Sequence, residues 1–194
     1  HGHGMESGFR DAFFQVASFI STTGYVSADY DQWPSFAKIC LVLLYFTGAC
    51  AGSTAGGIKI SRFVVLLRGI GVSVSKVLHP REARPILYNG RKVENNVLGL
   101  VLTFFALYIA IIILFSTAIA FTGEDIITAV TAVAACLSSV GPGFGTVVGA
   151  TGNFSSLTPA AKIMLAFVMM LGRLEMYTVL ILFSRNFWQG QSRW

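Results

Sequence analysis

The chain has 194 residues, of which 54% are hydrophobic and only 12% are charged. This charged share is about half that of an ordinary soluble domain, so the composition excludes a typical water-soluble protein and favours a membrane protein. The net charge of +5 alone would fit a nucleic-acid partner, but the charges are divided by segment. Residues 68–94 hold six Lys and Arg, whereas residues 21–33 and 122–158 hold acidic residues and no Lys or Arg. The positive-inside rule therefore predicts that the 68–94 loop is cytoplasmic and that the other two segments face outside. Since this orientation accounts for the uneven charge, we predict no nucleic-acid partner.

The first apolar segment is too short to cross a bilayer as a helix. Residues 12–28 are uncharged, but Gly24 limits the helical part to nine or ten residues. At 1.5 Å per residue such a helix crosses about half of the hydrocarbon core. A half-length helix followed by the turn Ser21-Thr22-Thr23-Gly24-Tyr25 predicts a re-entrant pore loop.

The next segment is a Pro34-led apolar helix that runs into the stretch FTGACAGSTAGGIKIS at residues 46–61. Backbone that is not helical at membrane depth is tolerated only where protein buries it or a water-filled cavity solvates it. We therefore expect the chain to unwind here beside a permeation path. The residues that break the helix are Gly48, Gly52, Ser53, Thr54, Gly56 and Gly57.

The second half of the chain has the same order of parts. Residues 95–123 are uncharged and long enough to span a bilayer, and residues 126–161 are uncharged but interrupted at Gly141. A second long helix is expected from Pro159 to Phe187, ending at a cytoplasmic C-terminus. Lys38 and Lys162, near the starts of the two long helices, are expected to extend to the outer interface.

The two halves resemble each other, which predicts a duplicated pore. Setting Gly24 against Gly141 aligns the two short segments; after a loop, Ala37-Lys38-Ile39 matches Ala161-Lys162-Ile163, and Gly48 then falls opposite Gly172. This order predicts an all-α membrane protein of helix–pore-loop–helix repeats, with re-entrant half-helices and a broken helix.

Both turns can present backbone carbonyls to a cation. Rings of carbonyl oxygens replace the hydration shell of a potassium ion, and each preceding half-helix directs its partly negative C-terminal end at the turn. The alternative is a pair of tight turns that only join helices. The predicted potassium-binding carbonyls belong to Thr22, Thr23, Gly24, Ser139, Val140 and Gly141.

Arg173 lies within the last long apolar segment. A charge at membrane depth is costly and usually faces a cavity or a partner, so we expect either a pore-facing side chain or a structural ion pair. No catalytic arrangement is apparent: Gly52 to Lys59 imitates a phosphate-binding loop, but Ile58 separates the Gly and Lys that the motif requires side by side. We predict neither an enzyme nor a resident cofactor, with potassium as the transported ion.

The motifs TTGY, GACAGSTAGGIK, SSVGPGFG and LGRLE occur in the order seen in the Trk/Ktr/HKT superfamily of potassium transporters. The chain resembles the C-terminal half of a bacterial Trk-type pore subunit, and two of its features depart from that pattern. The first two of the family's four pore repeats are absent, and Ser138-Ser139 stands where relatives often have Asn-Asn.

This resemblance implies a division of the chain into 1–67 (end of the third pore repeat), 68–94 (basic loop), 95–189 (fourth repeat) and 190–194 (tail). It also implies that Thr22 to Tyr25 and Ser139 to Gly141 line part of the selectivity filter. The segment from Gly48 to Gly57 would be the gate beneath it, with Arg173 in the pore.

The implied partners are the lipid bilayer of a bacterial inner membrane, the missing N-terminal pore repeats, a second copy in a homodimer, and a cytoplasmic nucleotide-binding regulatory subunit. Passage through the pore would be passive or ion-coupled, as in a symporter. Two alternatives stay open: a non-conducting truncated subunit that acts as a scaffold, and a transporter of another monovalent cation such as sodium or ammonium.

Overall fold

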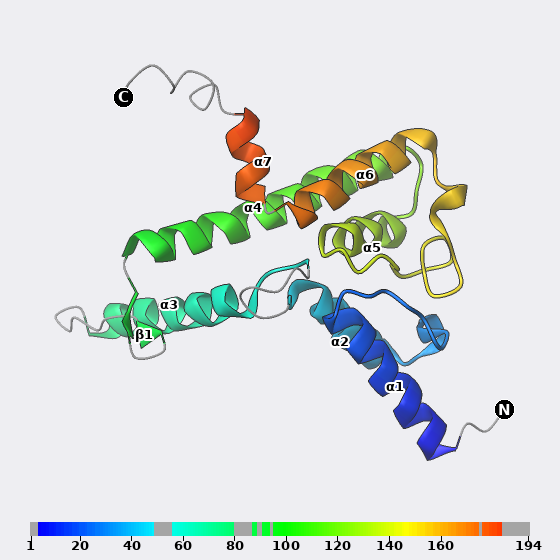
Figure 1. Cartoon of the computed structure of the whole chain (residues 1–194), viewed down its shortest axis with the longest axis horizontal. Coiled ribbons are helices and arrows are strands. Elements are labelled where there is room, and N and C mark those ends of the chain that lie inside the picture. Colours follow the sequence, from blue (N-terminus) through cyan, green and yellow to red (C-terminus); the bar gives the residue numbers. More distant parts are fainter. Residues whose placement is uncertain are drawn as a thin grey trace.

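The computed structural model describes residues 4–48, 56–79, 87–88, 91–93, 95–174 and 176–183. Within these residues the chain forms seven α-helices, two short 3₁₀ turns and one hairpin of two-residue strands (Figure 1). The expected all-α architecture is confirmed. Residues 49–55, which include Gly52, Ser53 and Thr54 of the expected gate, lie outside the described residues.

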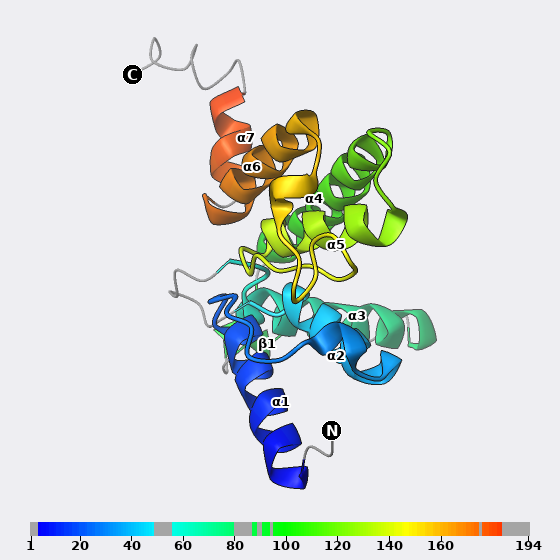
Figure 2. The ribbon, with the colours of Figure 1, turned by 90° about the vertical axis from the view of Figure 1, so that its right-hand side faces the viewer.

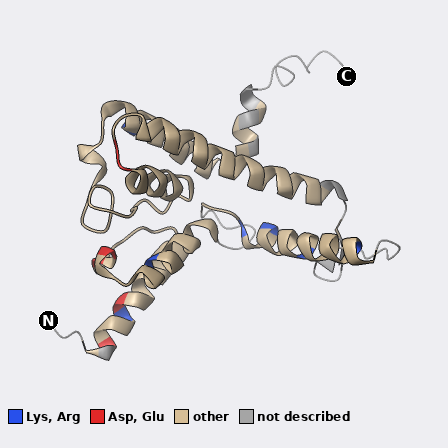
Figure 3. Ribbon diagram, turned by 180° about the vertical axis from the view of Figure 1, so that it is seen from behind, with Lys and Arg blue, Asp and Glu red and all other residues tan. Residues whose placement is uncertain are grey.

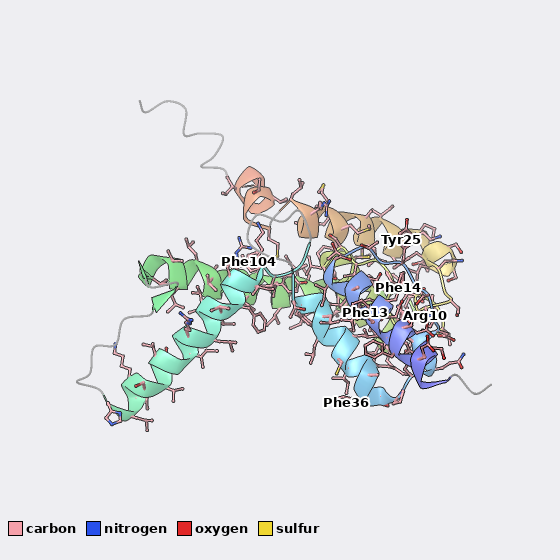
Figure 4. All side chains as sticks on the ribbon, turned by 60° about the horizontal axis from the view of Figure 1, so that its bottom comes forward. Arg10, Phe13, Phe14, Tyr25, Phe36 and Phe104 are labelled. Atoms are coloured by element: carbon pink, nitrogen blue, oxygen red, sulfur yellow. The ribbon has the colours of Figure 1, made fainter. Side chains whose placement is uncertain are left out.

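The first helix is longer than the sequence predicts. Helix α1 spans Met5–Ile20, so its nine uncharged residues from Ala12 onward are preceded by about two turns of helix that contain charged side chains. The 3₁₀ turn η1 (Tyr30–Gln32) and helix α2 (Ser35–Phe46) follow, and α2 packs against α1. Aromatic side chains such as Phe13 of α1 and Phe36 of α2 are mostly exposed (Figure 4).

Helix α3 spans Ile60–Leu78 and continues through the first eleven residues of the expected 68–94 loop, so the prediction of a loop from residue 68 is wrong for this part. The apolar residues of α3 recur along one side of the helix, as in an amphipathic helix. This periodicity explains why the chain stays helical where the charge pattern predicted only a basic loop. The strands β1 (Leu87–Tyr88) and β2 (Arg91–Lys92) pair antiparallel within the remaining loop. The guanidinium of Arg62 lies 4.2 Å from the centre of the Phe104 ring and joins α3 to α4 (Figure 4).

Helix α4 (Asn95–Ala120) agrees with the predicted spanning segment. An 18-residue stretch within Val97–Ala120 has a mean hydropathy of 2.9, and among the described residues this is the one helix long and apolar enough to cross a membrane by length and composition. Helices α2 and α5 are apolar but shorter.

The last predicted helix is interrupted. Helix α6 spans Pro159–Arg173 and α7 spans Met176–Phe183, so the expectation of one continuous helix from Pro159 to Phe187 is wrong. In Figure 1, α7 turns away from the end of α6. The first half breaks at the corresponding place, because α2 ends two residues before Gly48 and α6 ends one residue after Gly172.

Helix α5 (Ile126–Leu137) lies at the centre of the packing. It contacts α4 and α6 on one side and α2 on the other, and its residues from Ala132 to Leu137 are all buried (Figures 1 and 2). Leu137 belongs to the core shared with α4, α6 and α7, whereas Ala135 belongs to an aromatic core shared with α1 and α2. The half-length helix therefore joins the two halves of the chain.

The two ends of the described chain differ in charge. Helix α3 carries Lys and Arg but no acidic residue, whereas Asp29, Asp31, Glu124 and Asp125 lie at the end formed by η1 and by the turn before α5, together with Lys38 of α2 (Figure 3). This separation follows the long direction of α4. The positive-inside rule assigns the α3 end to the cytoplasm, and that orientation stays a prediction.

Candidate functional site

The turns that follow α1 and α5 have the same backbone conformation. Ser21 and Ser138 are both right-handed, with φ of −78° and −77°. Thr22 and Ser139 then have φ of +53° and +59°, and Gly24 and Gly141 have φ of +75° and +104°. Positive φ at a residue with a side chain is uncommon, and here it occurs twice at equivalent positions. Two different sequences therefore fold into one strained geometry.

The hydrogen bonds of the two turns also match. In each turn, four successive N–H groups donate back to carbonyls in the last turn of the preceding helix, with N···O distances between 2.9 and 3.5 Å. The equivalent pairs are Ser21 to Ala17 and Ser138 to Ala134, Thr22 to Phe19 and Ser139 to Cys136, Thr23 to Ser18 and Val140 to Ala135, and Gly24 to Ser18 and Gly141 to Ala135.

The carbonyl oxygens of these turns have no such partners. Among the described residues, no hydrogen bond to the carbonyls of residues 22–24 or 139–141 is present. Tyr25 differs, because its carbonyl accepts a hydrogen bond of 2.7 Å from Ser18 Oγ and its side chain is 72% exposed. Of the predicted residues, Tyr25 therefore closes the first turn, and the six predicted carbonyls are the unpaired ones.

The two turns meet at Gly24. A Cβ added to Gly24 would overlap the carbonyl oxygen of Val140 and lie 3.1 Å from Cδ of Pro142. Only glycine combines this contact with a positive φ at low cost. The structure thus brings together the two turns that the internal repeat singled out.

The glycine-rich segment lies against the second turn. Gly48 donates a hydrogen bond of 2.8 Å to the carbonyl of Ile58, which brings the two ends of the segment together. A Cβ at Gly56 would overlap the Ser138 carbonyl oxygen and lie 2.8 Å from Cβ of Ser139. Gly57 has a φ of +78°. Three of the six expected gate residues in this segment are therefore placed, and Gly56 touches the turn itself.

Arg173 is the last residue of α6 and is exposed. Within the described residues its guanidinium makes no hydrogen bond or ion pair. The adjacent Gly172 packs on the C-terminal end of α5, where an added Cβ would overlap the carbonyl oxygen of Leu137. The backbone at Arg173 is thus close to the residue that precedes the second turn, although no contact with the described part of the glycine segment is present.

Sequence reasoning missed three side chains that hold the chain just beyond the second turn. The hydroxyl of Tyr45 donates to the carbonyl of Pro142 at 2.6 Å, and the hydroxyl of Tyr30 donates to the carbonyl of Gly143 at 2.8 Å. The Asp31 carboxylate accepts from the N–H of Gly145 at 3.1 Å and from that of Ala150 at 3.0 Å. No local sequence pattern predicts these contacts, because the partners are about a hundred residues apart. The one available signal was the presence of tyrosine within apolar sequence, since a buried hydroxyl needs a hydrogen-bond partner.

The two lysines form a further matched pair. Lys38 Nζ donates to the carbonyl of Asp31, and Lys162 Nζ donates to the carbonyl of Ser155 at 2.7 Å. Each lysine therefore folds back onto the short 3₁₀ turn that precedes its helix. These bonds close the outer connections, and the location of both lysines at the outer interface stays a prediction.

No group of three or more His, Cys, Asp or Glu side chains that could hold a metal ion occurs within the described residues. The site is instead one of backbone oxygens. Since α1 and α5 both end at the turns, the partly negative ends of two helix dipoles adjoin these oxygens and favour a cation there.

Comparison with known proteins identifies the family of the chain. Residues 5–193 match the family model TrkH, described as a cation transport protein. The chain is 37% identical over 180 residues to the Trk system potassium uptake protein TrkH of Escherichia coli K12, covering 93% of this chain and 37% of that protein. It is 35% identical over 176 residues to the Trk system potassium uptake protein TrkI of Halomonas elongata, covering 91% and 36%.

A crystal structure of the potassium transporter TrkH from Vibrio parahaemolyticus superimposes with a TM-score of 0.87 at 32% identity, covering 96% of this chain and 39% of that one. The chain therefore spans a little over a third of the length of the curated relatives it matches. The match to the family model includes nearly all of the chain, from the first residue of α1 to beyond α7. The chain belongs to the TrkH family of membrane cation transport proteins.

Proposed function

We propose that this chain forms part of a potassium-permeable pore, in which its two turns supply two segments of a selectivity filter. The observation that carries the proposal is the matched geometry of the turns. Both have the same alternation of φ, the same four N–H bonds to the preceding helix, and carbonyls at equivalent residues that accept no hydrogen bond from the described residues. When neighbouring N–H groups all point back to the helix, the intervening carbonyls are left to face an ion.

Part of the filter must come from outside this chain. Two turns provide half of a fourfold ring, so we propose that further pore repeats complete it. This agrees with the length of the relatives, of which the chain spans little more than a third. The segments 1–67 and 95–189 would be the end of a third repeat and a fourth repeat, joined by the cytoplasmic 68–94 segment and followed by a 190–194 tail.

The glycine segment from Gly48 to Gly57 is the proposed gate. Its support is the close approach of Gly56 to Ser138 and Ser139, which lies at the entry to the second turn. Arg173 is proposed to face the pore from the end of α6, where its guanidinium opposes a cation by Coulomb repulsion. The side chain is exposed and makes no ion pair within the described residues. Both facts support a side chain that faces a cavity rather than one that forms a buried ion pair.

The names of the relatives also bear on the transported ion, the location and the partners of this chain. The relatives are named as potassium uptake proteins of a Trk system, which supports potassium as the ion. We propose a bacterial inner-membrane location with the α3 end and the C-terminus in the cytoplasm, a homodimer, and a separate nucleotide-binding regulatory subunit docked on the basic surface of α3.

The test is Gly24→Ser in the full-length transporter that contains this chain, reconstituted in liposomes. The new Cβ would overlap the Val140 carbonyl oxygen, and the positive φ at this position is unfavourable for serine. Because both effects disturb the turn, we expect the reversal potential to shift toward that of sodium by tens of millivolts. Gly71→Ser is the matched control, since a Cβ at Gly71 of α3 meets nothing within 4 Å.

Each result has a distinct meaning. An unchanged preference for potassium in a folded Gly24→Ser protein would overturn the filter assignment. Equal passage of sodium or ammonium through the unmodified protein would identify a less selective cation pathway. No flux with any monovalent cation would identify a scaffold subunit.

A further inference from the structure

The second turn is followed by a longer outer connection than the first. Lys38 follows Gly24 by 14 positions, whereas the equivalent Lys162 follows Gly141 by 21 positions. The additional residues fall between Gly141 and the second 3₁₀ turn, η2 (Phe154–Ser156), and we call residues 142–150 of this connection the outer loop. An insertion this close to the turn adds backbone whose position must be fixed by contacts from elsewhere.

Those contacts come from the other half of the chain. Tyr45 and Tyr30 donate to the first two carbonyls of the outer loop, those of Pro142 and Gly143. Asp31 accepts from Gly145 through Oδ1 and from Ala150 through Oδ2, so one carboxylate joins both ends of the remaining loop. Because each carboxylate oxygen accepts a backbone N–H of the loop, the Asp31 side chain is held in one orientation by both bonds.

The tyrosine hydroxyls are held in place by their rings. Tyr30 is 0% exposed and Tyr45 is 1% exposed. Phe19 stacks on Tyr45 with ring centres 5.3 Å apart and packs edge-on against Tyr30 at 5.7 Å. Phe144, inside the outer loop, packs against Tyr30 at 5.1 Å and Tyr45 at 6.0 Å. With four rings interlocked, a hydroxyl cannot move without repacking the cluster.

Burial and the neighbouring charges of Asp31 and Asp29 raise the pKa of Tyr30. Its hydroxyl therefore keeps its proton at neutral pH and stays a donor to Gly143. The contact is lasting, and it does not switch with physiological changes in pH.

Within the described residues, no side chain of the other half donates a hydrogen bond to a carbonyl of the first turn, residues 22–25. The closing carbonyl of this turn, that of Tyr25, is held by Ser18 within the same helix–turn unit. The corresponding residue of the second half, Ala135, has no hydroxyl, and the carbonyl of Pro142 is held by Tyr45 of α2 instead. The two turns share a backbone conformation but are stabilised by different means.

We propose that Tyr30, Asp31 and Tyr45 form a clamp that positions the carbonyls of Val140 and Gly141 and so sets how well the second turn discriminates between cations. The Gly141 carbonyl lies in the peptide plane that ends at Cα of Pro142, and the proline ring restricts φ at that residue. A displacement of the Pro142 carbonyl group is therefore passed on to the peptide plane that contains the Gly141 carbonyl. The clamp rests on the proposed function, because it assumes that these carbonyls contact the ion. These three are positioning residues, since none of them faces the ion.

The experiment is Tyr45→Phe in the full-length transporter, which removes the hydroxyl and keeps the ring. Tyr108→Phe is the matched control: Tyr108 of α4 is 2% exposed, its ring packs against Phe104 and Phe46, and its hydroxyl has no hydrogen-bond partner within the described residues. The measurements are the sodium-to-potassium permeability ratio, the maximal potassium flux and the melting temperature in detergent.

We expect Tyr45→Phe to raise the permeability ratio three-fold or more while the maximal potassium flux stays within about two-fold, and Tyr108→Phe to leave the ratio unchanged. Tyr30→Phe is the second variant, with a smaller effect in the same direction because its carbonyl partner is one residue farther from Gly141. A lower melting temperature with an unchanged ratio in both tyrosine variants would show a purely structural role and overturn the clamp.

Gly24→Ser in the same assay separates the two proposals. If Gly24→Ser shifts the ratio and neither tyrosine variant does, the clamp is wrong and the filter stands. If Gly24→Ser leaves the ratio unchanged, the filter assignment fails first. A shifted ratio in Tyr108→Phe would show that any buried hydroxyl affects selectivity, which would also overturn the clamp.

Discussion

Gly56→Ala tests the contact between the glycine segment and the second turn. The added Cβ would overlap the Ser138 carbonyl oxygen and lie 2.8 Å from Cβ of Ser139, where ordinary contacts begin at 3.4 Å. Relief of both contacts requires a shift of about 1 Å by one of the two backbones. Ser138 is completely buried and bonded into the end of α5, so we expect the glycine segment to be the part that moves.

The size of the effect follows from the cost of this crowding. Inserting one methyl group into a close-packed contact typically costs about 1–3 kcal/mol. If the segment touches the turn only in the closed state, that cost falls on the closed state alone. The open fraction would then rise by roughly 5- to 150-fold, until the open state predominates.

The assay is potassium flux into liposomes containing the full-length transporter without any activating partner. Gly71→Ala serves as the control, because a methyl group there meets no atom within 4 Å. We expect higher basal flux in Gly56→Ala with the preference for potassium unchanged. Lower flux from a folded protein would refute the reasoning, since the segment would then support the turn and not block it; a lost preference for potassium would show that the turn, and not the segment, gave way.

Three further results are expected. Arg173→Ala should raise single-channel conductance at equal surface expression, whereas Arg173→Lys should keep most of the barrier, because a unit charge at 4 Å is worth about 1 kcal/mol even in water and several times more at a lower effective dielectric. Gly141→Ala should weaken the preference for potassium less than Gly24→Ala in the same flux assay. Both substitutions place alanine at an unfavourable positive φ, but only the Cβ at position 24 would also overlap the Val140 carbonyl oxygen. Asp125→Ala should lower the free energy of unfolding by about 1 kcal/mol, measured as a fall in melting temperature, because its carboxylate caps α5 through the N–H of Ile127 at 3.2 Å.

The sequence predicted best where composition alone decides the structure. The uncharged run of α4 and the short apolar run of α5 follow from hydropathy, and the alignment of Gly24 with Gly141 found the two turns. Glycine is informative at these positions because the turn requires positive φ there. The equivalent positive φ at Thr22 and Ser139 could not be predicted, since neither residue type favours it.

The sequence predicted poorly where tertiary contacts override local pattern. The charged residues before Ala12 suggested that the first helix begins late, yet α1 starts at Met5. The break between α6 and α7 comes just after Gly172, but one glycine inside a long apolar run did not predict the end of the helix. Hydrogen bonds such as that from Tyr45 to Pro142 join distant residues and leave no periodic signal in either segment.

The shared strain of the two turns is the strongest reason to treat them as functional. A residue with a side chain pays about 1–2 kcal/mol to adopt positive φ, and a chain free to drift would relieve that strain by placing glycine at the position. Thr22 and Ser139 keep it in two sequences that have otherwise diverged. Joining helices would not require such a turn, because many unstrained connections do so. Strain that recurs where carbonyls stand unpaired is expected of a site that must present several oxygens at once. The means of support differ between the halves, so substitutions in the clamp should affect the second turn and spare the first.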